Sequence, residues 1–350
     1  MSKNIKTLFQ FLLFFGLGML ILWLSYNNFS KAYEEECIIK GISTEDCSLI
    51  DKIIEDFKHV NYYWILLISV LFMISNIFRS LRWKQLLAPL GYQPKLMNAL
   101  GATMIGYLAN LGLPRMGEII KPGILTKYDG IPIEKGMGTI VIDRILDVIA
   151  LLLIILFAIL MSFKTFKEYF KNNFSIDSMQ NLKYLVLLVV VAFVILFFLN
   201  RFLKTTDSED PLVIKVKSIW LGFKDGLKSV TRVQNFPLLV LYSALIWLMY
   251  YLMTYFCFFA YAPTMNFGLV AALVVFVFGT LGIVFPSPGG MGSYHFLVSQ
   301  ALIIYGLNSA DAFSFSNIIF FTIQIFGNIF FGVLFLIILP IYNKNNPGVQ

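Results

Sequence analysis

Long apolar stretches with almost no charged residues recur along this sequence, and they constrain its fold more than any other feature. Hydrophobic residues make up 58% of the chain and charged residues only 13%, whereas a water-soluble domain carries roughly 25% charged residues. A transmembrane helix needs about 20 consecutive, mostly apolar residues. The sequence therefore predicts an all-α polytopic membrane protein whose 350 residues form a single integral membrane domain.

We expect about six full spans, at residues 8–26, 62–78, 136–161, 184–199, 237–260 and 313–339. The first stretch follows Lys3 and Lys6, as a signal peptide would. It is long for the apolar core of a signal peptide and lacks a small-residue cleavage site, so we interpret it as a signal-anchor span.

Charge between the spans predicts the topology. The segment 79–95 holds Arg79, Arg82, Lys84 and Lys95 without an acidic neighbour, which marks it as cytoplasmic; Trp83 would be an interfacial anchor there. The acidic segment 27–61 is then an external loop, and the basic segment 200–236 a cytoplasmic linker, either on the membrane surface or solvated. Both termini are expected to be cytoplasmic, in a bacterial cytoplasmic (inner) membrane.

Two apolar runs are interrupted rather than continuous. Residues 98–113 would make a helix of about 24 Å, against a hydrocarbon core of about 30 Å, and the loop charges balance only if this run re-enters the same face. Residues 267–285 run into PSPGG and a second short stretch. We therefore predict two re-entrant hairpins in two halves, 8–161 and 184–340, of opposite orientation. Such broken segments of an inverted repeat typically mark a transporter's binding site.

Six ionisable residues sit at or beside membrane depth near the first hairpin, where each charge costs about 2.5–3.5 kcal/mol unless it faces a protein interior or water. On a helix Asp143 and Asp147 share a face, and Arg144 can pair with Asp147. Two interpretations remain open: a self-neutralised structural network, or a positive site that binds an anionic headgroup through arginine. The six are Arg115, Glu118, Lys121, Asp143, Arg144 and Asp147.

The second hairpin offers few side chains, so we expect backbone N–H groups of PSPGG to contribute, unless the stretch is a simple helix-breaking turn. Tyr294 and His295 follow it; either could meet a headgroup, although a histidine at a helix start is often only hydrogen-bonded. The predicted substrate-binding residues are Asn110, Arg115, Glu118, Lys121, Asp143, Arg144, Asp147, Pro288, Gly289, Gly290, Tyr294 and His295.

Other classes of function find little support. Cys37 and Cys47 either form a disulfide in the external segment or are two free thiols, and Cys257 lies deep in a span. No cysteine or histidine pattern suggests a metal or cofactor, and no catalytic motif is present, so we predict that the protein is not an enzyme. The basic residues set topology, and no nucleic-acid partner is expected.

Four motifs give the chain a recognisable order: R-x-x-R-W-x-x-L-L at 79–87, G-x-x-x-N-x-x-x-P-R-x-G-E at 106–118, D-R-x-x-D at 143–147 and P-x-P-G-G-x-G at 286–292. Together they resemble the lysylphosphatidylglycerol synthase transmembrane, flippase-like family over nearly the whole chain. Lys121 and His295 depart from that pattern, where members often have arginine and glutamate. The soluble aminoacyl transferase domain of the full-length synthases has no counterpart here, so the resemblance implies lipid handling without aminoacylation.

We therefore expect a lipid transporter that moves an anionic phospholipid or a polyprenyl-phosphate-linked lipid between leaflets. One alternative is a non-catalytic lipid-binding scaffold for a separately encoded synthase or glycosyltransferase. Another is a membrane-embedded transferase that uses Asp143 or Asp147 as its base. The sequence leaves the oligomeric state open.

Overall fold

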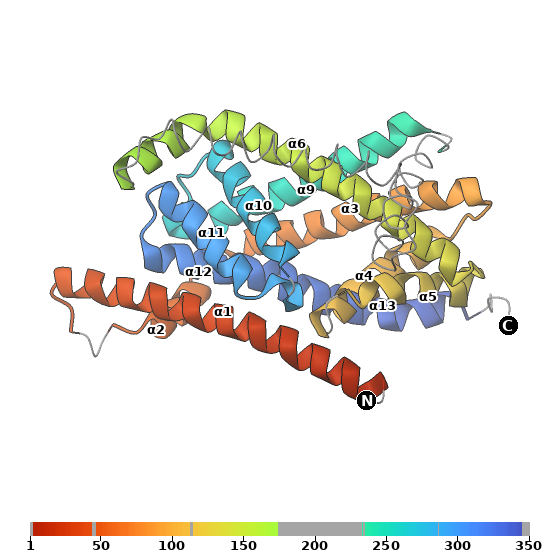
Figure 1. Ribbon diagram of the computed structural model, residues 1–350, viewed down its shortest axis with the longest axis horizontal. Coiled ribbons are helices and arrows are strands. Elements are labelled where there is room, and N and C mark those ends of the chain that lie inside the picture. The colour runs from red at the N-terminus through yellow and green to blue at the C-terminus, as the bar shows by residue number, and fades with distance from the viewer. Residues whose placement is uncertain are drawn as a thin grey trace, which may run out of the picture.

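The computed structural model describes residues 3–43, 47–112, 115–173, 233, 235–285 and 287–344, and all regular structure within them is helical (Figure 1). Five of these helices are long and apolar enough to cross a membrane: Leu12–Ile39, Tyr62–Leu90, Ile133–Thr165, Phe236–Ala260 and Ser309–Tyr342. They match five of the predicted spans. The sixth, at 184–199, and almost all of the predicted linker at 200–236 lie outside the described residues.

The first half of the fold is a long helix, a short helix and a compact group of four helices. Helix α1 lies along one edge of the bundle and α6 along the opposite edge (Figure 1). Between α3 and α6, the two helices α4 and α5 pack against each other as a hairpin. The elements are α1 (Lys3–Ile39), α2 (Leu49–Lys58), α3 (Tyr62–Leu87), α4 (Leu96–Gly112), α5 (Gly117–Asp129) and α6 (Ile133–Asn173).

The second half repeats this order. A long helix precedes a hairpin of two short helices, and a final helical stretch, interrupted by seven π-helical residues at Phe321–Gly327, completes it. The elements are α9 (Phe236–Ala260), α10 (Leu269–Val284), α11 (Ser293–Ile304), α12 (Ser309–Phe320) and α13 (Asn328–Tyr342). The predicted interruptions therefore fall where the helices break, between α4 and α5 and between α10 and α11.

Packing between the halves is reciprocal. Helix α3 packs on α9, the first hairpin is covered by α13 through α4, and the second is covered by α6 through α10. If the two halves are exchanged, the contact of α13 with α4 becomes the contact of α6 with α10, and the contact of α3 with α9 is unchanged. In Figure 1, α3 and α9 run side by side in opposite directions. The inverted repeat of residues 8–161 and 184–340 stays a prediction, because much of 184–236 lies outside the described residues.

The helix that carries the first predicted span is longer than that span. Helix α1 continues beyond residue 26 to Ile39, and α2 occupies much of the rest of the predicted loop 27–61. Tertiary contacts explain the difference, because Phe29 is buried and stacks on Phe313 of α12 with ring centroids 5.0 Å apart. Leu49, at the start of α2, is fully buried in the same cluster. Burial therefore holds a polar stretch in helical form.

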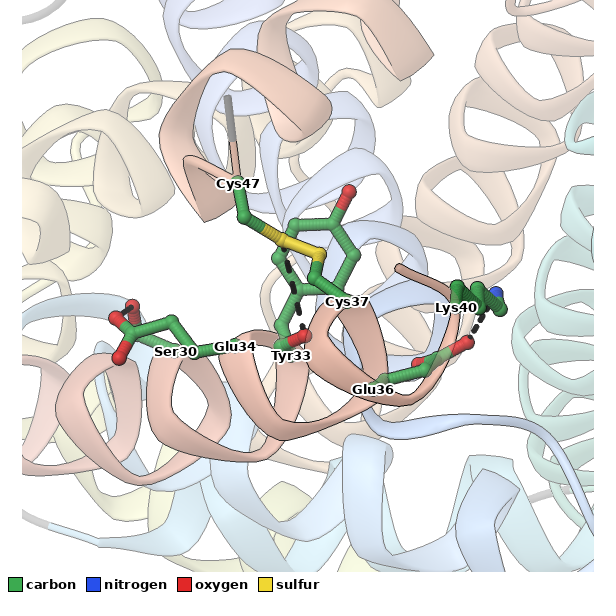
Figure 2. Close-up of a disulfide and its surroundings, with 7 residues drawn as sticks. All are labelled: Ser30, Tyr33, Glu34, Glu36, Cys37, Lys40 and Cys47. Carbon is green, nitrogen blue, oxygen red and sulfur yellow. Dashed lines mark hydrogen bonds and ion pairs between the residues drawn. A yellow bond between two sulfur atoms is a disulfide. The ribbon is translucent and has the colours of Figure 1, made fainter. Parts of the chain in front are cut away.

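The disulfide that the sequence left open is formed. Cys37, near the end of α1, is bonded to Cys47, just before α2, with Cα atoms 6.4 Å apart (Figure 2). Both cysteines are buried. The bond closes the turn between the two helices.

Ion pairs fasten α2 to the second half of the chain. Lys52 Nζ lies 3.0 Å from Asp56 and 2.6 Å from Asp311 of α12, and the Tyr261 hydroxyl is 2.9 Å from a carboxylate oxygen of each aspartate. Burial acts to lower the pKa of Lys52, but its hydrogen bonds to the two carboxylates outweigh this and raise the pKa above the ordinary 10.5. Lys52 therefore stays charged at neutral pH.

Candidate functional site

A buried ion network joins α3 to α6. Arg82 is fully buried, and its Nε donates to Asp143 Oδ1 at 2.8 Å while its Nη2 donates to Asp147 Oδ1 at 2.6 Å. Arg79 Nη1 donates to the other oxygens of the two aspartates, at 3.3 and 2.8 Å. Two arginines and two carboxylates thus neutralise one another with shared, charge-assisted hydrogen bonds.

The helices place this network inside the candidate spans. Arg79 and Arg82 are one turn apart on α3, and Asp143 and Asp147 are one turn apart on α6, so each pair faces the other helix. Arg79 is about two turns from the end of α3. Arg82 also donates to the Ser243 hydroxyl of α9 at 3.1 Å, which connects the network to the second half.

Two residues assigned from sequence to a positively charged cytoplasmic loop, Arg79 and Arg82, are therefore buried network members. Trp83 is not an interfacial anchor either: it is 3% exposed, and its indole N–H donates to Thr139 of α6 at 2.9 Å. The partners lie more than fifty residues away along the chain, so local charge counting could not find them. The predicted shared face of Asp143 and Asp147 is confirmed.

A second ion pair lies at the exposed edge of the network. Arg144 Nε is 3.3 Å from Glu118 Oε1, with side chains 44% and 37% exposed. The predicted pairing of Arg144 with Asp147 does not form, because both oxygens of Asp147 are taken by Arg79 and Arg82. Arg144 thus joins α6 to α5 instead.

Lys121 is one of two cations in the group without a matching carboxylate among the described residues. It is 7% exposed and lies over the Tyr107 ring, with Nζ 4.9 Å from the centroid. Among the described residues no carboxylate pairs with it. Its stem crosses α4 at Gly106, where a Cβ would lie 2.7 Å from Lys121 Cγ, so glycine there makes room for the lysine. The ammonium interacts electrostatically with the network, including Arg79 and Asp143.

The turn between α4 and α5 is shaped by Asn110. Its side-chain oxygen accepts a hydrogen bond of 2.7 Å from the N–H of Gly117, at the start of α5. A Cβ on Gly117 would collide with the carbonyl oxygen of Gly106, so the two helices touch through glycine. Asn110 therefore acts here as a cap that closes the hairpin.

Arg115 lies in this turn with an unusual backbone. Its φ is 68°, and within the described part of the chain Arg115 is the non-glycine residue that has a positive φ. An L-residue in this region is strained by roughly 1–2 kcal/mol. The side chain is exposed, and no acidic partner is found for it among the described residues. Strain that persists at a site is a reason to look for function there.

The tip of the second hairpin reaches the first hairpin and α1. A Cβ on Gly289 would lie 3.5 Å from Leu111 near the end of α4, and one on Gly292 would lie 2.7 Å from the Gly18 carbonyl oxygen of α1. Pro288 and Gly290 are buried. Figure 1 shows the α10–α11 break close to the α4–α5 break. The two interruptions thus meet in the middle of the fold.

Backbone donors at this tip are largely used within the hairpin itself. The N–H groups of Gly290 and Met291 donate to Ser287 and Pro288 carbonyls, and that of Gly292 donates to His295 Nδ1 at 3.3 Å. Within PSPGG itself, the N–H groups of Ser287 and Gly290 donate to the carbonyls of Phe285 and Ser287, so the expectation of free N–H groups is wrong for these two residues. Their hydrogen bonds stabilise the sharp turn before α11.

Tyr294 and His295 are core residues. They are 7% and 3% exposed, and both rings pack on Phe320 of α12, at 5.5 and 4.5 Å between centroids. Within the described residues, no hydrogen bond, ion pair or ring contact joins either one to the charged group on α3, α5 and α6. The prediction that they bind substrate has no geometric support here, and the hydrogen-bonded histidine is confirmed.

Summed over the charged group, the site is positive. Its cations outnumber its carboxylates by two, because the two arginine–aspartate pairs and the Arg144–Glu118 pair balance while Lys121 and Arg115 remain. No cluster of metal-ligating residues occurs in the part of the chain that the structure describes. The cations are Arg79, Arg82, Arg115, Lys121 and Arg144, and the carboxylates are Glu118, Asp143 and Asp147.

Comparison with known proteins gives relatives among archaeal membrane proteins. The UPF0104 membrane protein MJ1078 of Methanocaldococcus jannaschii is 22% identical over 234 residues, which is 65% of this chain and 94% of that protein. MJ1595 of the same organism is 27% identical over 169 residues, 47% of this chain and 46% of that protein. The glycosyltransferase AglD of Haloferax volcanii is 26% identical over 84 residues, only 14% of its length. No solved structure matches the chain.

The family comparison covers most of the sequence. Residues 48–332 match the family described as lysylphosphatidylglycerol synthase TM region. The matched range runs from α2 into α13 and includes the ion network, both hairpins and the π-helical interruption. The chain therefore belongs to the lysylphosphatidylglycerol synthase transmembrane family.

Proposed function

We propose that this protein is a flippase-like lipid transporter that moves an anionic phospholipid or a polyprenyl-phosphate-linked lipid between the leaflets of a bacterial cytoplasmic membrane. One observation carries the proposal: an excess of positive charge, including two cations that have no carboxylate partner among the described residues, lies beside the meeting point of two broken helix hairpins. A charged residue in hydrocarbon is costly unless it faces protein or water, and such residues mark substrate paths.

The fold supports this function through its hairpins. In the proposed arrangement the pairs α4–α5 and α10–α11 are re-entrant and six spans surround them. Their breaks would lie near the middle of the bilayer, where transporters built from inverted repeats bind their substrates. The headgroup would pass along Arg115, Glu118 and Arg144 while its acyl or prenyl tails stay in lipid.

The orientation is part of the proposal. The disulfide between Cys37 and Cys47 favours an oxidising, external side for the end of α1. Helix α1 begins, and α13 ends, in the same right-hand half of Figure 1, which agrees with two cytoplasmic termini. We propose no enzymatic activity for the chain and no nucleic-acid partner.

The direct test is lipid transfer in reconstituted vesicles. We expect purified protein to speed the exchange of a fluorescent anionic lipid between leaflets. The triple variant Arg115→Ala, Glu118→Gln, Arg144→Met should lose this activity, whereas Glu134→Gln with Lys135→Met should retain it, since both are exposed charges at the start of α6. Unchanged transfer by a triple variant that still folds would refute the proposal.

Co-purifying lipid gives an independent measurement. Mass spectrometry of detergent-solubilised protein should find a defined anionic lipid enriched in the wild type and lost from Arg115→Ala, Arg144→Ala. The same bulk lipid in both samples would contradict a headgroup site here.

A lipid-binding scaffold is the second candidate. The relative named a glycosyltransferase matches this chain over a short segment, so a shared membrane module could present lipid to a separate enzyme. In that case a stoichiometric enzyme would co-purify with the protein, and the protein alone would not transfer lipid.

A further inference from the structure

Two cations on the first hairpin have no carboxylate partner among the described residues, and their number indicates how much negative charge the ligand carries. We infer that the site binds a phosphate headgroup carrying two negative charges, a phosphomonoester or a diphosphate, rather than a singly charged phosphodiester or a zwitterion. This inference rests on the proposed function and names the substrate class of the same site.

Charge balance is the first step of the argument. The buried pairs between α3 and α6 use all four of their charges, and Glu118 is matched by Arg144. Among the described residues Lys121 and Arg115 are left over: Lys121 lies about one turn after Glu118 on α5, and Arg115 lies in the turn just before α5 begins. A ligand that neutralises the group must therefore supply two negative charges.

The burial of Lys121 makes the excess positive charge energetically unfavourable for the ligand-free protein. A buried ammonium without a carboxylate is unfavourable, and within the described part of the chain Lys121 lies over the electron-rich face of Tyr107 instead. The Arg79 Nε–H is also buried without an acceptor. A strongly anionic group that enters at the half-exposed Arg144–Glu118 pair would supply the counter-charge that Lys121 lacks among the described residues.

Access and geometry fit an oxyanion. Glu118 and Lys121 are three residues apart on α5 and so lie on one face of the helix. Arg144 is 44% exposed and bonded to Glu118 through a single contact of 3.3 Å. Its planar guanidinium can exchange that carboxylate for phosphate oxygens, because both make the same forked hydrogen bonds.

The test compares matched short-chain lipids. Binding of dihexanoyl phosphatidic acid, phosphatidylglycerol and phosphatidylcholine to the detergent-solubilised wild type would be measured at pH 8, where a phosphomonoester is a dianion. We expect phosphatidic acid to bind at least tenfold more tightly than phosphatidylglycerol, since a hydrogen bond to a charged group is worth that much. At pH 5 the phosphomonoester is singly charged, and the preference should disappear.

Two lysine variants locate the effect. Lys121→Met should bring phosphatidic acid down to the affinity of phosphatidylglycerol and leave the latter unchanged. Lys127→Met is the matched control, because Lys127 also lies over a tyrosine ring on α5, at 5.1 Å from Tyr128, but is exposed. Lipid-free Lys121→Met should be at least as heat-stable as the wild type, since it removes an unpaired buried charge. A strongly destabilised variant would instead assign Lys121 a structural role.

The outcomes separate this inference from the proposed function. Equal binding of phosphatidic acid and phosphatidylglycerol, with lipid transfer intact, would refute the preference for a doubly charged headgroup but would be consistent with the proposed transport function. A preference for phosphatidic acid in a protein that transfers no lipid would support the doubly charged headgroup and refute the proposed transport function. Displacement of phosphatidic acid by an equal concentration of inorganic phosphate would assign the chemistry to free phosphate and overturn the lipid as its source.

Discussion

Removing Arg82 should expose how the buried network is balanced. Arg82→Met keeps an unbranched apolar stem but leaves Arg79 alone against Asp143 and Asp147, so one carboxylate is buried without a counter-charge. Breaking a buried pair in this way costs about 3–5 kcal/mol. At roughly 2 °C or more per kcal/mol, we expect the melting temperature in detergent to fall by about 6 °C or more.

A second substitution should reverse part of that loss. Adding Asp147→Asn to Arg82→Met removes one charge of each sign and leaves Arg79 with Asp143. The same Asp147→Asn in the wild type leaves two arginines against one carboxylate. We therefore expect Asp147→Asn to lower the melting temperature of the wild type and to raise that of Arg82→Met, measured by fluorescence-detected size-exclusion after heating.

Arg144→Met is the matched control for this series. Its guanidinium is 44% exposed and pairs with a half-exposed carboxylate, and such pairs contribute only about 0–1 kcal/mol. We expect a shift of no more than a few degrees. If Arg82→Met melts within about 2 °C of the wild type, or if Asp147→Asn destabilises both backgrounds equally, the network is not balanced as described.

The remaining predictions concern the turns and the disulfide. Arg115→Gly should be up to about 1–2 kcal/mol more stable than Arg115→Ala, because glycine adopts a φ of 68° without strain, while both lose lipid transfer; equal melting temperatures would argue against a strained residue. Gly117→Ala should destabilise the protein because its Cβ would meet the Gly106 carbonyl oxygen, whereas Gly123→Ala, with nothing within 4 Å, should be neutral or slightly stabilising; thermal melts of both decide this. A reducing agent should lower the melting temperature of the wild type but not that of Cys37→Ser, Cys47→Ser, as a bond closing a loop of this size contributes about 2–3 kcal/mol; a reducing agent without effect on the wild type would contradict a bond that matters for stability.

Local sequence patterns were enough for the helices and the hairpin breaks. Apolar length, glycine and proline act through neighbouring residues, so the five described spans and the interruptions at 113–116 and 285–292 could be predicted. The end of α1 could not, because Phe29 stays helical by packing on Phe313, which is distant in sequence.

The candidate site divides in the same way. Asp143, Asp147, Glu118 and Lys121 were recognisable because charge is rare in apolar sequence. Arg79 and Arg82 were not, since an arginine near the end of a span looks the same whether it meets water or a carboxylate on another helix.

The sequence by itself determined a helical membrane protein with paired hairpin breaks and charges that must be shielded, because hydrocarbon excludes polar groups regardless of the tertiary fold. The tertiary structure alone decided which charges neutralise one another, because ion pairing depends on distances of a few ångströms between α3, α5 and α6. It also decided that Tyr294 and His295 are packed into the core, while Lys121 is buried with no carboxylate partner among the described residues. The ion pairs between different helices, rather than the residue types alone, determine where the excess positive charge lies.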